Sequence, residues 1–289
     1  MSLSESGLES SSREALELYF ESLRNEEQHG MENVTGNIYD YPVYYDLVFA
    51  SDWVAEFKFL EATFKKHVDG KTKRVLEPAC GTGRLLFRMA KNGYIAEGLD
   101  LNEKAIAYCN ARLKKHEFKP SAWVADMCDF TVKKPFDAAF NTINSFRHLG
   151  TEKAAVAHFR AMANAVRPGG IYALGFHLTP LEGIASDTES WTARRGNLQI
   201  NTRMWPRDKD VKARMERFNL RFEIYRPTGS IRIDDCLALR SYTWKQFASM
   251  IKKVPEWSIE AAYDFTYDIH EPIEIDAGTE DVVYILKRK

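Results

Sequence analysis

The chain has 289 residues, of which 45% are apolar and 28% charged, and its formal net charge is −1 at pH 7. This composition is typical of an ordinary folded domain, and it excludes a disordered chain and a protein built from membrane-spanning helices. A net charge near zero also gives the molecule as a whole no attraction to nucleic acid.

The cysteines at positions 80, 109, 128 and 236 form no C-x-x-C pair and no cluster with histidine. We therefore expect reduced thiols, no disulfide framework and no bound metal. Residues 1–13 are rich in Ser and Glu and lack the apolar core of a signal peptide. That absence predicts a cytoplasmic protein without a membrane partner.

The charge is unevenly distributed along the chain. Between Trp191 and Arg232 there are eleven Lys or Arg residues against four acids, which gives this segment a net charge of +7 and leaves −8 elsewhere. A basic segment of this kind is a candidate surface for an anionic acceptor or partner.

Residues 1–70 are predicted to form a helical and aromatic cap. Apolar residues recur at helical spacing over Ser12–Glu27, which predicts an amphipathic helix. A polar stretch over residues 25–37 follows, then an aromatic-rich segment, Tyr39–Phe49, and a helical pattern over Trp53–His67.

Residues 71–178 alternate short β-type runs with helical ones, which is the pattern of repeated βα units around a parallel sheet. Pro168-Gly-Gly170 is expected to separate the last helix from the last strand. The expected strands are Arg74–Glu77, Tyr94–Leu99, Ala122–Ala125, Phe136–Phe140 and Ile171–Phe176, and the expected helices are Gly83–Lys91, one capped by Asn102 that ends at Lys115, and one capped by Thr151 that ends at Val166.

The βα alternation stops after His177. Within residues 179–240, Asn197–Met204 and Arg217–Tyr225 alternate polar and apolar residues, which predicts antiparallel strands joined by turn material over Pro206–Asp210. Residues 241–289 are expected to complete the core sheet, with a helix from a capping box at Thr243 to Lys252 and strands over Ser258–Thr266 and Glu280–Leu286.

The turn after the first core strand carries the chemistry. Its glycines expose backbone N–H groups at the start of a helix, where a ligand can approach closely. A dinucleotide fingerprint would place glycine at all three positions occupied here by Ala79, Gly81 and Arg84. With two of the three missing, a ligand without pyrophosphate fits better.

Two acids follow at strand ends and fit a nucleoside. Asp100, 17 residues beyond Gly83, ends the second strand and is placed to accept hydrogen bonds from both ribose hydroxyls. Asp126 ends the third strand and is placed to accept from an adenine amino group. The alternative is that these acids only cap helices or pair with arginine.

Four ordered motifs resemble those of the class I S-adenosylmethionine-dependent methyltransferases. They are Glu77-Pro-Ala-Cys-Gly-Thr-Gly83, Gly98-Leu-Asp100, Ala125-Asp-Met127, and Phe136-Asp137 leading to Asn141. The resemblance covers residue 73 to about residue 176, and the two final strands extend it. It implies a Rossmann-like, mostly parallel sheet of seven strands with helices on both faces.

The resemblance also implies S-adenosylmethionine as the methyl donor and S-adenosylhomocysteine as the product. By it, Glu77 contacts the ammonium end, Gly81 and Gly83 line the donor, and Asp100 holds the ribose. The family usually has glycine where Ala79 stands. The remaining implied donor contacts are Asp126 and Met127 at the adenine, Asn141 near the sulfonium, and Tyr45, Ala79, Cys80, Arg84 and Leu101 around them.

Methyl transfer needs an acceptor aligned with the S–CH₃ bond, and a base where the acceptor arrives protonated. His148 follows the fourth core strand at the ligand-binding edge of the sheet and is the candidate base for an N or O acceptor on a small molecule. The alternative is that His148 packs against or caps the next helix. Weaker candidates are Asn144 in catalysis and, for acceptor binding, Tyr44, Arg147, Trp191 and Arg203.

Other functions remain open at this point. No Asp/Asn-Pro-Pro-Tyr/Phe or Pro-Cys sequence follows the fourth strand, which disfavours methylation of nucleic acid bases. A non-catalytic protein that binds the donor and recognises a partner through residues 179–240 is an alternative, and an RNA or protein methyltransferase is another. The sequence leaves the acceptor and the oligomeric state undetermined.

Overall fold

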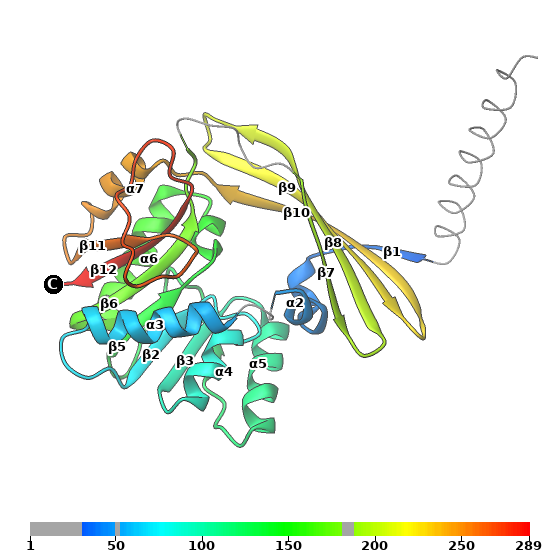
Figure 1. Ribbon diagram of the computed structural model, residues 1–289, viewed down its shortest axis with the longest axis horizontal. Helices are drawn as coiled ribbons and strands as arrows, with labels where there is room; N and C mark the ends of the chain where they lie inside the picture. The colour runs from blue at the N-terminus through cyan, green and yellow to red at the C-terminus, as the bar shows by residue number, and fades with distance from the viewer. Residues whose placement is uncertain (1–30, 50–52, 181–187) are drawn as a thin grey trace, which may run out of the picture.

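The computed structural model describes residues 31–49, 53–180 and 188–289 (Figure 1). These residues form two sheets, a seven-stranded sheet in the main domain and a five-stranded sheet beside it. Helix α2 (Pro42–Phe49) lies between the two (Figure 1). The helix predicted over Ser12–Glu27 falls outside the described residues.

The seven-stranded sheet confirms the predicted α/β class. Its order is β11-β12-β6-β5-β2-β3-β4. All neighbouring pairs are parallel except the two made by β12, so only β12 runs against the others. The strands are β2 (Arg74–Pro78), β3 (Ile95–Asp100), β4 (Ala122–Val124), β5 (Phe136–Asn141), β6 (Val166–His177), β11 (Trp257–Tyr263) and β12 (Asp281–Arg288).

Helices cover both faces of this sheet and bury two separate apolar clusters. One cluster joins the sheet to α3 (Trp53–His67), α4 (Arg84–Lys91) and α5 (Glu103–Lys115). The other joins it to α6 (Glu152–Ala165) and α7 (Trp244–Ile251). Each face is therefore sealed from water, which leaves the strand ends as the accessible edge of the sheet.

The helix starts predicted from polar residues are confirmed. Asn102 accepts from Ala105 N, Thr151 accepts from Ala154 N, and Thr243 forms a full capping box with Gln246. Each cap satisfies a backbone N–H that the first helical turn leaves without a partner.

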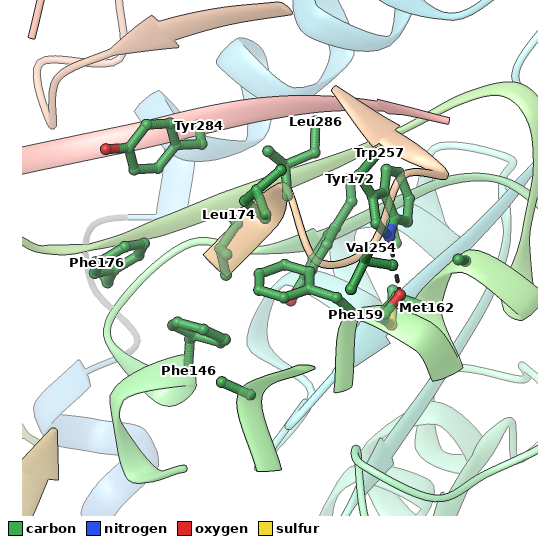
Figure 2. Packing of buried hydrophobic residues seen from close by; sticks show 14 of the residues in the cluster. Phe146, Phe159, Met162, Tyr172, Leu174, Phe176, Val254, Trp257, Tyr284 and Leu286 are labelled. Carbon is green, nitrogen blue, oxygen red and sulfur yellow. Dashed lines mark hydrogen bonds between the residues drawn. The ribbon is translucent and has the colours of Figure 1, made fainter. Parts of the chain in front are cut away.

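The cluster on the α6 side is rich in aromatic residues, which pack together with aliphatic ones (Figure 2). Phe146, Phe159 and Tyr172 are buried there, and Trp257 Nε1 donates to the carbonyl of Phe159 at 2.9 Å. Phe146 belongs to the short helix η2 (Ser145–His148). Packing of Phe146 into the core therefore fixes the segment that carries His148.

The five-stranded sheet contains the predicted antiparallel strands and adds one from the N-terminal segment. Its order is β1-β10-β9-β8-β7, and β1 is parallel to β10. Its apolar face packs on α2 and on the short helix η1 (Ile38–Asp40). The strands are β1 (Met31–Thr35), β7 (Glu189–Arg195), β8 (Leu198–Asp210), β9 (Met215–Arg226) and β10 (Gly229–Arg240).

Two sequence predictions about turns were wrong. Pro206–Asp210 belongs to β8, because the strand passes the proline at a register shift and then continues through the cross-strand ion pairs Asp208–Arg217 and Lys209–Glu216. Pro168-Gly-Gly170 lies within β6, since the chain enters the extended conformation at Val166 directly after α6.

Candidate functional site

The turn after β2 has an uncommon backbone. Ala79, Gly81 and Gly83 all have positive φ, at 52°, 51° and 70°. This left-handed conformation costs a non-glycine residue about 1 to 2 kcal/mol, so Ala79 is held there by its surroundings. The same strain is what a glycine at this position would avoid.

Gly83 is also restricted by packing, which gives a first prediction. A Cβ on Gly83 would lie 2.2 Å from Cys109 Sγ, whereas one on Gly81 would meet nothing within 4 Å. We expect Gly83→Ala to lower the free energy of unfolding by about 2 to 3 kcal/mol more than Gly81→Ala. Urea denaturation of both variants measures the difference, and equal losses would show that backbone strain alone matters.

Asp100 connects the end of β3 to this turn. One carboxylate oxygen accepts from Gly81 N and the other from Asn102 N, both at 2.8 Å. Burial raises the pKa of Asp100, and these backbone N–H groups offset part of the rise. The Asp100 carboxylate thus lies beside the glycine turn, as a ribose-binding acid requires.

The side chains of Glu77 and Arg84, near the start of α4, both have partners within the protein. The Glu77 carboxylate accepts from Leu86 N at 2.9 Å, and burial raises the pKa of Glu77 well above its usual value. Arg84 forms an ion pair with the buried carboxylate of Glu56 on α3. The structure therefore places Arg84 in a bridge between two helices.

The remaining predicted donor contacts divide into exposed and buried residues. Leu101 is 68% exposed next to Asp100, and Asp126 is exposed with its carboxylate accepting from Cys128 N at 2.8 Å. The side chains of Cys80 and Met127 are buried in the two core clusters. For these two residues only the main chain remains to contact a ligand.

Asn141 lies at the end of β5, next to the end of β2. It is 5% exposed, and its Nδ2 donates to the carbonyl of Pro78 at 2.8 Å. Its Oδ1 is buried without a hydrogen-bond partner among the described residues. A buried acceptor of this kind is costly unless a donor reaches it.

Helix α2 is fixed to the turn after β2 and to α5 by a buried carboxylate. Asp46 accepts from Thr82 Oγ1 at 3.0 Å and from Tyr108 OH at 3.2 Å, and its ion pair with Arg112 is 2.5 Å long. The preceding helix η1 is attached next to Asp100, because Asp40 accepts from Asn102 Nδ2 at 2.7 Å. The aromatic segment thus covers the strand ends.

The aromatic segment brings one tyrosine to His148. The Tyr39 hydroxyl lies 3.0 Å from His148 Nε2, and the ring centroids are 5.7 Å apart. Burial raises the pKa of Tyr39 well above its usual value, while partial desolvation and nearby Arg147 lower the pKa of the exposed His148. At neutral pH the pair is therefore a phenol beside a neutral imidazole.

Tyr39 was not among the residues selected from the sequence, which favoured Tyr44 and Tyr45. Tyr45 packs on Tyr39, with ring centroids 5.2 Å apart, and burial raises its pKa to about 12. Tyr44 does not contact Tyr39 or His148 in this way. Its hydroxyl accepts a hydrogen bond of 3.0 Å from Arg226, which belongs to the five-stranded sheet. The sequence did not indicate that Tyr39 lies in the short helix η1, and so it did not indicate that this tyrosine reaches His148.

The structure does not bring the weaker candidates together at His148. Asn144 accepts from the backbone N–H of His177, and Arg147 forms a buried ion pair with Glu216. Trp191 packs against Phe49 on the apolar face of the five-stranded sheet. Arg203 lies on the opposite face, over the ring of Trp205.

An open cavity of about 490 Å³ is lined by residues between Asp264 and Asp281, none of which was predicted to bind the donor. Within residues 31–49, 53–180 and 188–289, no group of His, Cys, Asp or Glu is arranged to hold a metal ion. No helix in those ranges is long and apolar enough to cross a membrane.

Residues 75–170 match a family model described as a methyltransferase domain. A putative methyltransferase of Geobacillus sp. (strain WCH70) is 25% identical over 121 residues, which is 42% of this chain and 49% of the relative. The dTDP-3-amino-3,6-dideoxy-alpha-D-glucopyranose N,N-dimethyltransferase of Streptomyces fradiae is 30% identical over 132 residues, 44% of this chain and 49% of the relative. The chain thus spans about half the length of these curated relatives.

The fold has a counterpart among solved structures. An S-adenosylmethionine-dependent methyltransferase from Clostridium acetobutylicum ATCC 824 superposes with a TM-score of 0.68 at 16% identity, over 85% of this chain and 96% of that one. The likeness therefore extends beyond residues 75–170 to most of the described chain.

Proposed function

We propose that the chain is a class I S-adenosylmethionine-dependent methyltransferase that methylates an amine or hydroxyl on a small sugar-like molecule, with His148 taking the proton. The observation that carries this proposal is the 3.0 Å contact between Tyr39 and His148, which lies beside the strand ends that hold Asp100 and Asn141. The named substrate of the Streptomyces fradiae relative, an amino sugar, supports an amine as the first acceptor to test.

The residues present fit S-adenosylmethionine. The Oδ1 of Asn141, which has no hydrogen-bond partner among the described residues, suits an ammonium donor, and the exposed side chain of Leu101 suits the apolar face of a nucleoside. Asp100 suits the ribose, since each carboxylate oxygen keeps acceptor capacity beyond its bond to the backbone. Asp126 at the next strand end suits the adenine amino group.

The chain's own contribution to the chemistry is alignment and proton removal. Bound S-adenosylmethionine supplies a methyl group already activated on a sulfonium. Alignment of two reactants is worth about 7 to 11 kcal/mol, and a base adds about 10² to 10⁴ in rate. The neutral imidazole of His148 accepts the acceptor's proton at Nδ1, in the tautomer whose Nε2–H donates to the Tyr39 oxygen and so fixes the ring.

An acceptor screen tests this proposal. Purified protein with S-adenosylmethionine is incubated with free amino sugars, with the same sugars carried on a nucleoside diphosphate, and with matched hydroxyl sugars, and methylated product is detected by mass spectrometry. Product from an amino sugar, and its loss in His148→Gln, would support the proposal. Donor binding without product from any of the three sets would instead favour a non-catalytic donor-binding protein.

The nucleotide-linked sugars in the screen also test the predicted anionic acceptor. The basic segment offers less free charge than its sequence suggests, because Arg217 pairs with Asp208, Arg221 with Asp234 and Arg232 with Glu223. Arg203 remains exposed on the outer face. We therefore expect the diphosphate to improve binding of the sugar by less than tenfold.

A further inference from the structure

Asp235 belongs to the five-stranded sheet but faces the candidate active site. Side chains alternate along a strand, and the buried Ile231 and Ile233 place Asp235 on the same, inner face of β10. Its neighbour Asp234 lies on the outer face, where both carboxylate oxygens accept from Arg221. The two aspartates therefore have the same charge and opposite surroundings.

The Asp235 carboxylate holds the start of η1. One of its oxygens accepts from Ile38 N at 2.8 Å, and the other accepts from Cys236 N at 2.7 Å. Ile38 is fully buried, so its N–H has no water to replace this acceptor. The next residue is Tyr39, whose hydroxyl meets His148. The position of the Tyr39 ring thus depends on a side chain of β10.

Asp235 also acts on His148 through its charge. The Tyr39 hydroxyl on η1 contacts the imidazole directly, while Arg147 on η2 and Asp235 on β10 act on it through their charges. Desolvation and Arg147 lower the pKa of His148, and Asp235 raises it. Asp235 therefore opposes Arg147 and keeps the imidazole more basic than it would otherwise be.

We infer that Asp235 is a positioning residue of the active site, which orients Tyr39 through Ile38 and provides the negative charge that supports His148 as a base. The inference rests on the proposed role of His148. If Asp235 has this role, the five-stranded sheet contributes to the active site, because β10 positions Tyr39 while the core positions His148.

The test needs no acceptor. Full-length wild type, Asp235→Asn and Asp234→Asn are compared by NMR titration of the His148 ring, assigned with His148→Gln, and by hydrogen exchange of the Ile38 amide. In Asp235→Asn we expect the pKa of His148 to fall, because the negative charge of Asp235 raises it. We also expect Ile38 to exchange about tenfold faster, since Asn has no charge and only one acceptor oxygen for the two backbone donors, Ile38 N and Cys236 N. Asp234→Asn should change neither.

Equal titration and exchange in the two variants would overturn the inference. Where Asp235→Asn does not fold, Asp235→Glu replaces it: the retained charge should preserve the pKa of His148 while the longer side chain speeds exchange at Ile38, and unchanged exchange would overturn the positioning role. A shifted pKa in Asp235→Asn together with full turnover in His148→Gln would refute the proposed function while leaving the contact network intact.

Discussion

Asp100→Ala should weaken binding of S-adenosylhomocysteine by at least about a hundredfold. The change removes a carboxylate that would accept from the ribose hydroxyls, and each hydrogen bond to a charged group contributes about 1.5 to 3 kcal/mol. It also removes the acceptor of Gly81 N, which is 2.8 Å from the carboxylate and belongs to the turn after β2. Calorimetric titration of the purified variant measures the loss directly.

Asp100→Asn is the matched control, because it keeps the shape and one acceptor oxygen but removes the charge. We expect Asn at this position to bind more weakly than wild type and more tightly than Ala. Burial raises the pKa of Asp100, so wild-type affinity should fall on acidification at a higher pH than for an ordinary aspartate. Affinity unaffected by either change would remove Asp100 from the donor site.

The core of the fold could be predicted because its signals are local. Asn102, Thr151 and Thr243 cap their own helices a few residues away, and each βα unit closes within a short stretch of chain. The approach of Asp100 to the glycine turn after β2 could likewise be predicted, since both lie at the ends of adjacent strands. Local sequence was sufficient for these elements, although it wrongly predicted a break at Pro168-Gly-Gly170 and a turn over Pro206–Asp210.

The five-stranded sheet shows where local signals end. Strand β1 has a mostly polar sequence, Met31–Thr35, and exists because β10 pairs with it from about two hundred residues later in the chain. The candidate site depends on the same kind of contact. Tyr39 and His148 are 109 residues apart, and Ile38 and Asp235 are 197 apart. No periodicity within either segment indicates its partner.

His148→Gln should lower kcat by about 10² to 10⁴, the range usual for loss of a general base, while leaving the affinity for S-adenosylhomocysteine within about twofold. The amide of Gln can keep the contact with the Tyr39 hydroxyl but cannot accept a proton. The measurement is steady-state turnover with the acceptor found in the screen, and Tyr39→Phe, which leaves the imidazole in place, is the control with a smaller loss.

The pH profile separates a base from a residue that only packs. The pKa of His148 is lowered from 6.5, so its neutral form should persist through neutral pH and kcat should fall only on acidification below pH 6.5. His148→Gln should lack that acidic limb, because no group at this position then binds a proton. If His148→Gln kept the acidic limb, the titrating base would be another residue. If it kept wild-type turnover, His148 would have only a packing role, like that of Phe146 in the same short helix.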